Sequence, residues 1–119
     1  MVDEELYRQI DKLREQNILV VVEGLKDKAA LSAVGITNVL TLNKPLFAIV
    51  EQIAQQAKEC VVLTDLDNEG KQLYARLSQG LQRHGVKINN AFRHFLFRET
   101  QLRQIEGLSR VIPLRIFDA

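Results

Sequence analysis

The sequence predicts an α/β fold, with a mainly parallel central sheet of about four strands between two layers of helices in a Rossmann-like arrangement. Short apolar, β-branched runs alternate along the chain with segments whose apolar residues have helical spacing. The runs at 18–22 and 60–65 are continuous, which is typical of strands buried on both faces of a parallel sheet. Such alternation implies right-handed crossovers and helices on both faces.

The individual elements follow from local signals. The expected helices span residues 3–16, 26–34, 45–58, 68–84 and 99–107, and the expected strands span 18–22, 37–42, 60–65 and 86–95. Gly35 and Gly85 are placed to end helices, and Pro45 suits the first turn of one. Asp67 or Asn68 is expected to cap the helix that follows the third strand.

We expect one domain over residues 1–119, with an N-terminal helix at 1–16, a core at 17–95 and a basic helix and tail at 96–119. The helix at 99–107 is expected to end at Gly107. The stretch 111–117 is expected to be extended, and Pro113 makes it an edge strand or no strand.

The composition is that of a globular protein in a reducing compartment. The chain has 119 residues, of which 46% are hydrophobic and 26% charged. No apolar run approaches the roughly 20 residues that span a bilayer. The acidic N-terminus lacks the features of a signal peptide, and Cys60 alone allows neither an internal disulfide nor a multi-cysteine metal cluster. We therefore expect a cytoplasmic protein without membrane contact.

Charge is divided unevenly along the chain. Residues 1–70 carry 7 Lys/Arg and 12 Asp/Glu, whereas residues 71–119 carry 9 Lys/Arg and 3 Asp/Glu. An acidic half beside a basic half suits a metal site that faces a polyanion. An uneven scatter of surface charge would give the same count, so this observation leaves both interpretations open.

Carboxylates follow two of the predicted strands. Glu23 ends the first strand, and Asp65, Asp67 and Glu69 alternate where the third strand turns into a helix. Because parallel strands share a carboxyl edge, all four are expected at one edge of the sheet. Oxygen ligands favour Mg²⁺ or Mn²⁺, which suit phosphodiester chemistry. The alternative is that they are solvated turn residues stabilised by a helix dipole.

The order Glu-Gly, then Lys-Asp, then an apolar strand ending in DLDNEG resembles the toprim domain over about residues 17–95. That family includes type IA and type II topoisomerases, bacterial-type primases, OLD-family nucleases, RecR-like recombination proteins and the ribonucleases that mature 5S rRNA. The resemblance implies that Glu23 is a general acid or base. It also implies that Asp65, Asp67 and Glu69 hold Mg²⁺ or Mn²⁺.

Five neighbouring residues are candidates for substrate binding. Gly24 lets the chain turn sharply and lets a phosphate approach the backbone. Asp27, in EGLKD, matches a toprim position that is often acidic, and it is equally a first-turn helix carboxylate. Gly70 resembles the glycine that follows the third acidic residue. Lys26 and Lys71 could contact a phosphate or simply be solvated.

The C-terminal part interleaves basic and aromatic residues. Its cations are Arg93, His94, Arg98, Arg103 and Arg110, and its aromatics are Phe92, Phe95 and Phe97. The arginines could pair with phosphates, and aromatic residues among them could stack on bases. The alternation around 92–97 also fits a strand with one buried face, so we expect the phenylalanines in the core. His84 and His94 are expected to be structural or surface residues.

The leading functional hypothesis is a Mg²⁺-dependent enzyme acting on nucleic-acid phosphodiesters, a nuclease of the RNA-processing or DNA-repair type. The alternative is a non-catalytic nucleic-acid-binding or scaffold module that works with a partner protein or as a homodimer. Tyr7 and Tyr74 are poor candidates for a topoisomerase nucleophile, and a single cysteine does not fit a primase zinc segment. Phosphoryl transfer to aspartate is disfavoured because the Asp-x-Asp follows the third strand rather than the first.

Overall fold

A computed structural model describes residues 2–108 and confirms the α/β class. The strands are β1 (Leu19–Val22), β2 (Val39–Thr41), β3 (Glu59–Val62) and β4 (Lys87–Ile88). The helices are α1 (Val2–Gln16), α2 (Leu25–Ala33), α3 (Leu46–Gln56), α4 (Asn68–Arg83), α5 (Ala91–Glu99) and the 3₁₀ helix η1 (Ile105–Gly107). All strand pairs are parallel and the sheet order is β2-β1-β3-β4, so β1 and β3 are central neighbours.

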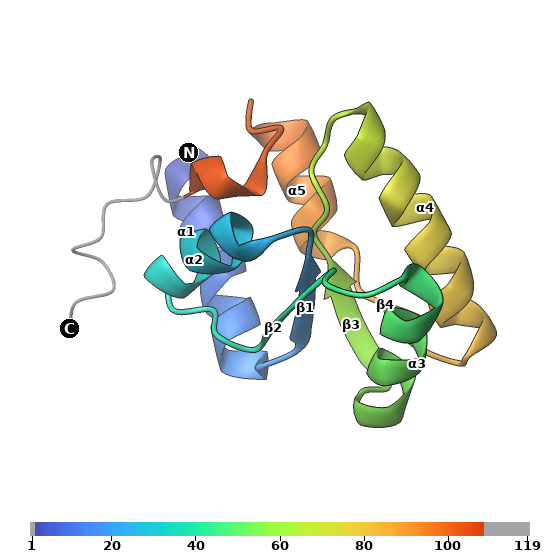
Figure 1. Ribbon diagram of the computed structural model, residues 1–119. Helices are drawn as coiled ribbons and strands as arrows, with labels where there is room; N and C mark the ends of the chain where they lie inside the picture. The colour runs from blue at the N-terminus through green and yellow to red at the C-terminus, as the bar shows by residue number, and fades with distance from the viewer. Residues whose placement is uncertain (1, 109–119) are drawn as a thin grey trace.

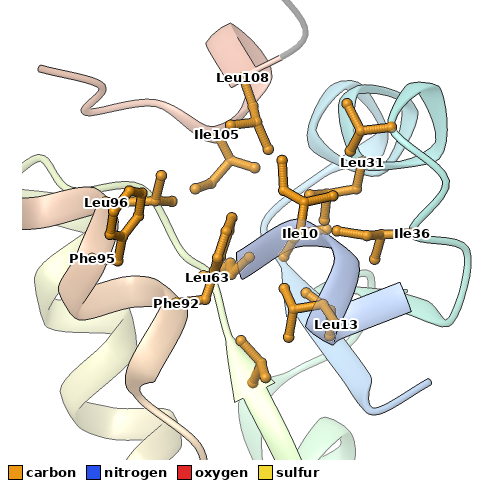
Figure 2. Packing of buried hydrophobic residues seen from close by; sticks show 14 of the residues in the cluster. Ile10, Leu13, Leu31, Ile36, Leu63, Phe92, Phe95, Leu96, Ile105 and Leu108 are labelled. Carbon is orange, nitrogen blue, oxygen red and sulfur yellow. The ribbon is translucent and has the colours of Figure 1, made fainter. Parts of the chain in front are cut away.

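Two hydrophobic cores lie on opposite faces of the sheet, because successive strand residues point to opposite sides. Val20 and Val22 of β1 pack in the core formed with α1, α2, α5 and η1, whereas Leu19 and Val21 pack in the core formed with α3 and α4. Figure 1 shows these two groups of helices on either side of the strands. Figure 2 shows side chains of the first core converging from α1, α2, α5 and η1.

The helix ends follow the predicted signals. Gly35 and Gly85 have φ of +85° and +77° and end α2 and α4, a conformation that glycine adopts without strain. Pro45 immediately precedes α3, and Asp67 is the N-cap of α4. No helix within residues 2–108 has both the length and the apolar character needed to cross a membrane.

The predicted strand at 86–95 is wrong for most of its length. Only Lys87–Ile88 form β4, and helix α5 begins at Ala91, whose amide donates to Asn89 Oδ1 (3.1 Å). Phe92, Phe95 and Leu96 are all buried, and their spacing is that of one helical stripe. The helical period therefore prevails over the alternation that the sequence also allows.

The predicted helix at 99–107 is also wrong. Thr100 ends α5, and Thr100 Oγ1 donates to Leu96 O (2.8 Å) and accepts from Leu102 N (3.2 Å). Only the short η1 forms within the segment, with Gly107 as its last residue. The predictions for 111–117 and for Arg110 lie outside the described residues.

Candidate functional site

The candidate site is built where β1 and β3 leave the sheet side by side. Glu23 directly follows β1, and the loop that begins at Asp65 follows β3. Asp65 N donates to Glu23 Oε2 over 2.7 Å, across 42 positions of sequence. This hydrogen bond brings together the two motifs that the sequence placed at a shared carboxyl edge.

Glu23 is a half-buried carboxylate in an acidic environment. Burial is the largest cause of its raised pKa, and the negative charges of Asp65, Asp27 and Asp67 raise the pKa further. The hydrogen bond from Asp65 N partly opposes this by stabilising the ionised form. A raised pKa makes the Glu23 carboxylate a stronger proton acceptor, as a general base requires.

Asp65 and Asp67 are fixed by backbone amides. Asp65 Oδ1 accepts from Ile105 N (2.9 Å), and Asp67 Oδ1 accepts from Gly70 N (2.8 Å) at the start of α4. Each carboxylate has a second oxygen that these bonds do not use. Glu69 lies exposed in the first turn of α4 and is not among the main charges acting on Glu23.

Gly70 is required by close packing rather than by its backbone angles. A Cβ at this position would lie 2.0 Å from the backbone oxygen of Asp65. Thr64, which is fully buried, donates from Oγ1 to Gly70 O (2.6 Å). The first turn of α4 therefore rests directly on the Asp65 loop. Gly24 differs, because a Cβ there would meet nothing within 4 Å.

Asp27 is a buried carboxylate whose charge acts on Glu23. It is only 7% exposed, and Asp27 Oδ2 accepts from Gly24 N (3.0 Å) at the start of α2. Burial is the main cause of its raised pKa, with the charges of Asp65 and Glu106 adding to it and amides of Gly24 and Glu106 opposing it. This carboxylate supports the Glu-Gly turn, while Lys26 beside it is exposed.

Arg93 is the main residue that sequence reasoning misplaced. The sequence allowed it to pair with phosphates, but it is only 6% exposed. Its Nη1 donates to Thr64 O (2.6 Å), its guanidinium lies 4.4 Å from the centre of the Tyr74 ring, and longer contacts reach Val62 O and Asp65 O. Burial lowers its pKa, and Glu23 and Asp65 act in the opposite direction. The Arg93 guanidinium is thus a buried cation close to the carboxylates. In the sequence, only its position on the apolar face of a helix could have indicated its burial.

The aromatic residues divide into two groups. Phe92 and Phe95 are buried as predicted, but Phe97 is 45% exposed and was wrongly expected in the core. Lys71 Nζ and the Arg103 guanidinium lie 5.1 and 5.5 Å from the centre of the Phe97 ring. His84 and His94 are exposed, in agreement with a surface role.

The donor chemistry fits a magnesium-type site that a substrate would complete. Among residues 2–108, no three Asp, Glu, His or Cys side chains converge closely enough to hold a metal on their own. Mg²⁺ usually takes only one or two protein carboxylates and keeps waters or substrate phosphates as its other ligands. The unused oxygens of Asp65 and Asp67, at the N-terminus of α4, match that requirement.

Comparisons with known proteins identify the family of this chain. The Toprim domain family matches residues 17–92. A UPF0292 protein of Pyrococcus abyssi is 38% identical over 102 residues, covering 83% of this chain and 77% of that protein. A UPF0292 protein of Methanocaldococcus jannaschii is 27% identical over 111 residues, covering 89% and 87%.

A solved structure of a protein from Aquifex aeolicus has a TM-score of 0.77 at 28% identity, covering 87% of this chain and 95% of that one. None of these three names states an activity. The family match connects the chain with metal binding and with nucleic acid. The chain belongs to the toprim domain family, as a small protein similar to the archaeal UPF0292 proteins.

Proposed function

We propose that this protein is a Mg²⁺- or Mn²⁺-dependent nuclease that hydrolyses phosphodiester bonds of RNA or DNA. The observation that carries the proposal is the position of Glu23, which is half-buried, accepts a hydrogen bond from Asp65 N and is acted on by the charges of Asp65, Asp27 and Asp67. A protein that only bound nucleic acid would gain nothing from a repulsive carboxylate cluster held at this edge.

In the proposed reaction Asp65 and Asp67 would hold the metal ion, and Glu69, exposed in the first turn of α4, would be a further acidic ligand. A bound Mg²⁺ would neutralise charge on the phosphate oxygens and lower the barrier to attack. Glu23 carries out the proton transfer: as a general base it accepts a proton from the attacking water, or as a general acid it donates one to the leaving oxygen. The raised pKa of Glu23 fits either role, and the amide of Asp65 fixes the carboxyl group that performs it.

Four further residues have proposed roles around the phosphate. Gly24 leaves open space above the turn after β1, so a phosphate could approach the backbone there. Lys26 and Lys71 are exposed cations at the starts of α2 and α4. Asp27 holds the Gly24 turn in place.

The test is a cleavage assay on single- and double-stranded RNA and DNA with Mg²⁺, Mn²⁺ or EDTA. Glu23→Gln keeps an oxygen that can accept from Asp65 N but cannot exchange the proton, so we expect a loss of about 10²–10⁴-fold, the range of general acid–base catalysis. Asp65→Asn keeps an acceptor for Ile105 N and removes a metal-binding charge. Glu15→Gln, an exposed change on α1, is the matched control.

Two results would separate the alternatives. Metal-dependent cleavage that is lost in both site variants and kept in Glu15→Gln supports the nuclease. A folded wild type that binds metal and nucleic acid but cleaves none of the four polymers contradicts it and favours the non-catalytic module. Cleavage that survives Glu23→Gln unchanged would instead exclude the proposed role of that carboxylate.

A further inference from the structure

An exposed cation–aromatic patch lies beside the acidic site. It consists of Phe97 on α5, Lys71 on α4 and Arg103 in the segment after α5. Phe97 keeps 45% of its surface exposed although both cations lie within 5.5 Å of the ring centre. The Arg103 guanidinium is held over its own loop by Nη1, which donates to Leu102 O (2.8 Å) and Thr100 O (3.3 Å).

Backbone hydrogen bonds tie this patch to the acidic loop. Leu66, which lies between the two aspartates, donates from N to Arg103 O (2.6 Å). Lys71 N donates to Asp67 O (2.9 Å), one helical turn from the cap of α4. The segment that carries Arg103 also contains Ile105, whose backbone N donates to Asp65 Oδ1. The patch and the acidic loop are therefore joined by backbone hydrogen bonds.

A mostly apolar hollow adjoins the ring. Its walls come from the acidic loop, α4 and α5, and its lining residues are Leu66, Lys71, Tyr74, Arg93, His94 and Phe97. A nucleobase that entered the hollow could stack on the exposed Phe97 ring by taking the place of one of the two cations that lie over it. The displaced cation could then contact a phosphate of the same strand. A protein partner with a flat acidic surface would match the cations but would leave this hollow without a matching group.

We propose that the cation–aromatic patch binds one unpaired nucleobase of a single-stranded segment next to the phosphate at the acidic site. This inference deepens the proposed function, because it names single-stranded nucleic acid as the substrate form. A base inside a duplex presents only its edges, so the ring could not stack on it. The competing interpretation is that Phe97 is an internal clip, which orders Lys71 and Arg103 and never meets a ligand.

The first experiment measures binding rather than cleavage, so that it can fail independently of the nuclease. Labelled single-stranded, duplex and abasic oligonucleotides are titrated in EDTA and in Mg²⁺ with wild type, Phe97→Ala and Phe97→Leu. Stacking on one base is worth about 1–3 kcal/mol, so each variant should bind the single strand about 5- to 150-fold more weakly. Phe47→Ala is the matched control, because Phe47 is 71% exposed on the distant helix α3.

The second experiment reads the contact directly. The chain has no tryptophan, so Phe97→Trp introduces a single reporter at the patch and Phe47→Trp introduces one elsewhere. Single-stranded oligonucleotides should quench the first reporter and leave the second unchanged. Lys71→Gln should reduce the slope of log K against log salt by about 0.7, the value for one phosphate contact on a single strand.

The two binding experiments have separate supporting and contradicting results. Weaker binding in both Phe97 variants, quenching of the Phe97→Trp reporter and loss of preference over the abasic strand support the proposal. Equal binding by Phe97→Ala and Phe47→Ala, equal binding of abasic strands, preference for duplex, or no binding in either condition overturns it. A duplex-specific nuclease would then still satisfy the proposed function, whereas a failure of cleavage alone would leave this binding result standing.

Discussion

Replacing Gly70 by alanine should damage the site without touching a carboxylate. The added Cβ would lie 2.0, 2.5 and 2.8 Å from the backbone O, C and N of Asp65. These are main-chain atoms, so no side-chain rotation can relieve the overlap. Either the first turn of α4 or the loop after β3 must move by more than an atomic radius.

The cost follows from the contacts that this movement breaks. The cap from Gly70 N to Asp67 contributes about 1 kcal/mol. Loss of the Thr64 hydrogen bond leaves a buried hydroxyl unsatisfied and costs about 1–3 kcal/mol. Overpacking adds about 1–3 kcal/mol, and the better helix propensity of alanine returns about 1 kcal/mol. The free energy of unfolding should therefore fall by about 2–6 kcal/mol.

Urea denaturation at pH 7 measures this change, and Gly24→Ala is its control. Gly24 has extended backbone angles and open space around it, so its replacement should cost under about 1 kcal/mol, the difference between glycine and alanine at an N-cap. If Gly70→Ala is as stable as Gly24→Ala, then the close packing of α4 on the Asp65 loop is not a real constraint. Any cleavage activity should fall in Gly70→Ala even at temperatures where it remains folded, because Asp65 is displaced.

Three further predictions concern buried ionisable groups. Arg93→Met should cost about 1–3 kcal/mol in urea unfolding, because it removes the buried hydrogen bond to Thr64 O. Arg98→Met on the exposed face of α5 should be nearly neutral, and equal effects would disprove the buried role. Burial raises the pKa of the Cys60 thiol from 9.0 to about 11, so the protonated thiol stabilises the fold fully below pH 9 and this stabilisation is lost as the pH rises to 11. In unfolding titrations wild type should lose about 3 kcal/mol more than Cys60→Ala between these pH values. Parallel curves would contradict the burial of the thiol. Burial also raises the pKa of Asp27, so ionisation of this carboxyl group lowers stability as the pH rises through that pKa. The stability of Asp27→Asn relative to wild type should therefore increase between pH 3 and pH 7. A decrease over the same range would show that burial does not raise this pKa.

The meeting of Glu23 with Asp65 could be predicted because it needs only two strands, a parallel sheet and the rule that parallel strands end at one edge. The cap at Asp67 could be predicted from local chemistry alone. The conformation of 91–99 could not, because Phe92 and Phe95 fit a helical stripe while Phe95 and Phe97 fit a strand. Burial against the other helices decides between the two periods, and a single sequence does not contain that information.

The hydrogen bond from Ile105 N to Asp65 was also beyond sequence reasoning. It spans 40 positions and uses a backbone donor, so no side-chain pattern signals it. The same holds for the bond from Leu66 N to Arg103 O. The motifs themselves supply the amides that hold Glu23 and Asp67, whereas the amide that holds Asp65 comes from a segment with no motif.

The basic residues in the second half of the chain therefore include both buried and exposed cations. Arg93 is buried, so it is withdrawn from any polyanion, and its charge interacts with those of Glu23 and Asp65. Lys71 and Arg103 remain exposed beside that loop, where nucleic acid at the acidic site could reach them. Net charge along the sequence overstates the attraction for phosphate, because it counts both kinds alike. The strength and salt dependence of binding should follow the exposed cations alone.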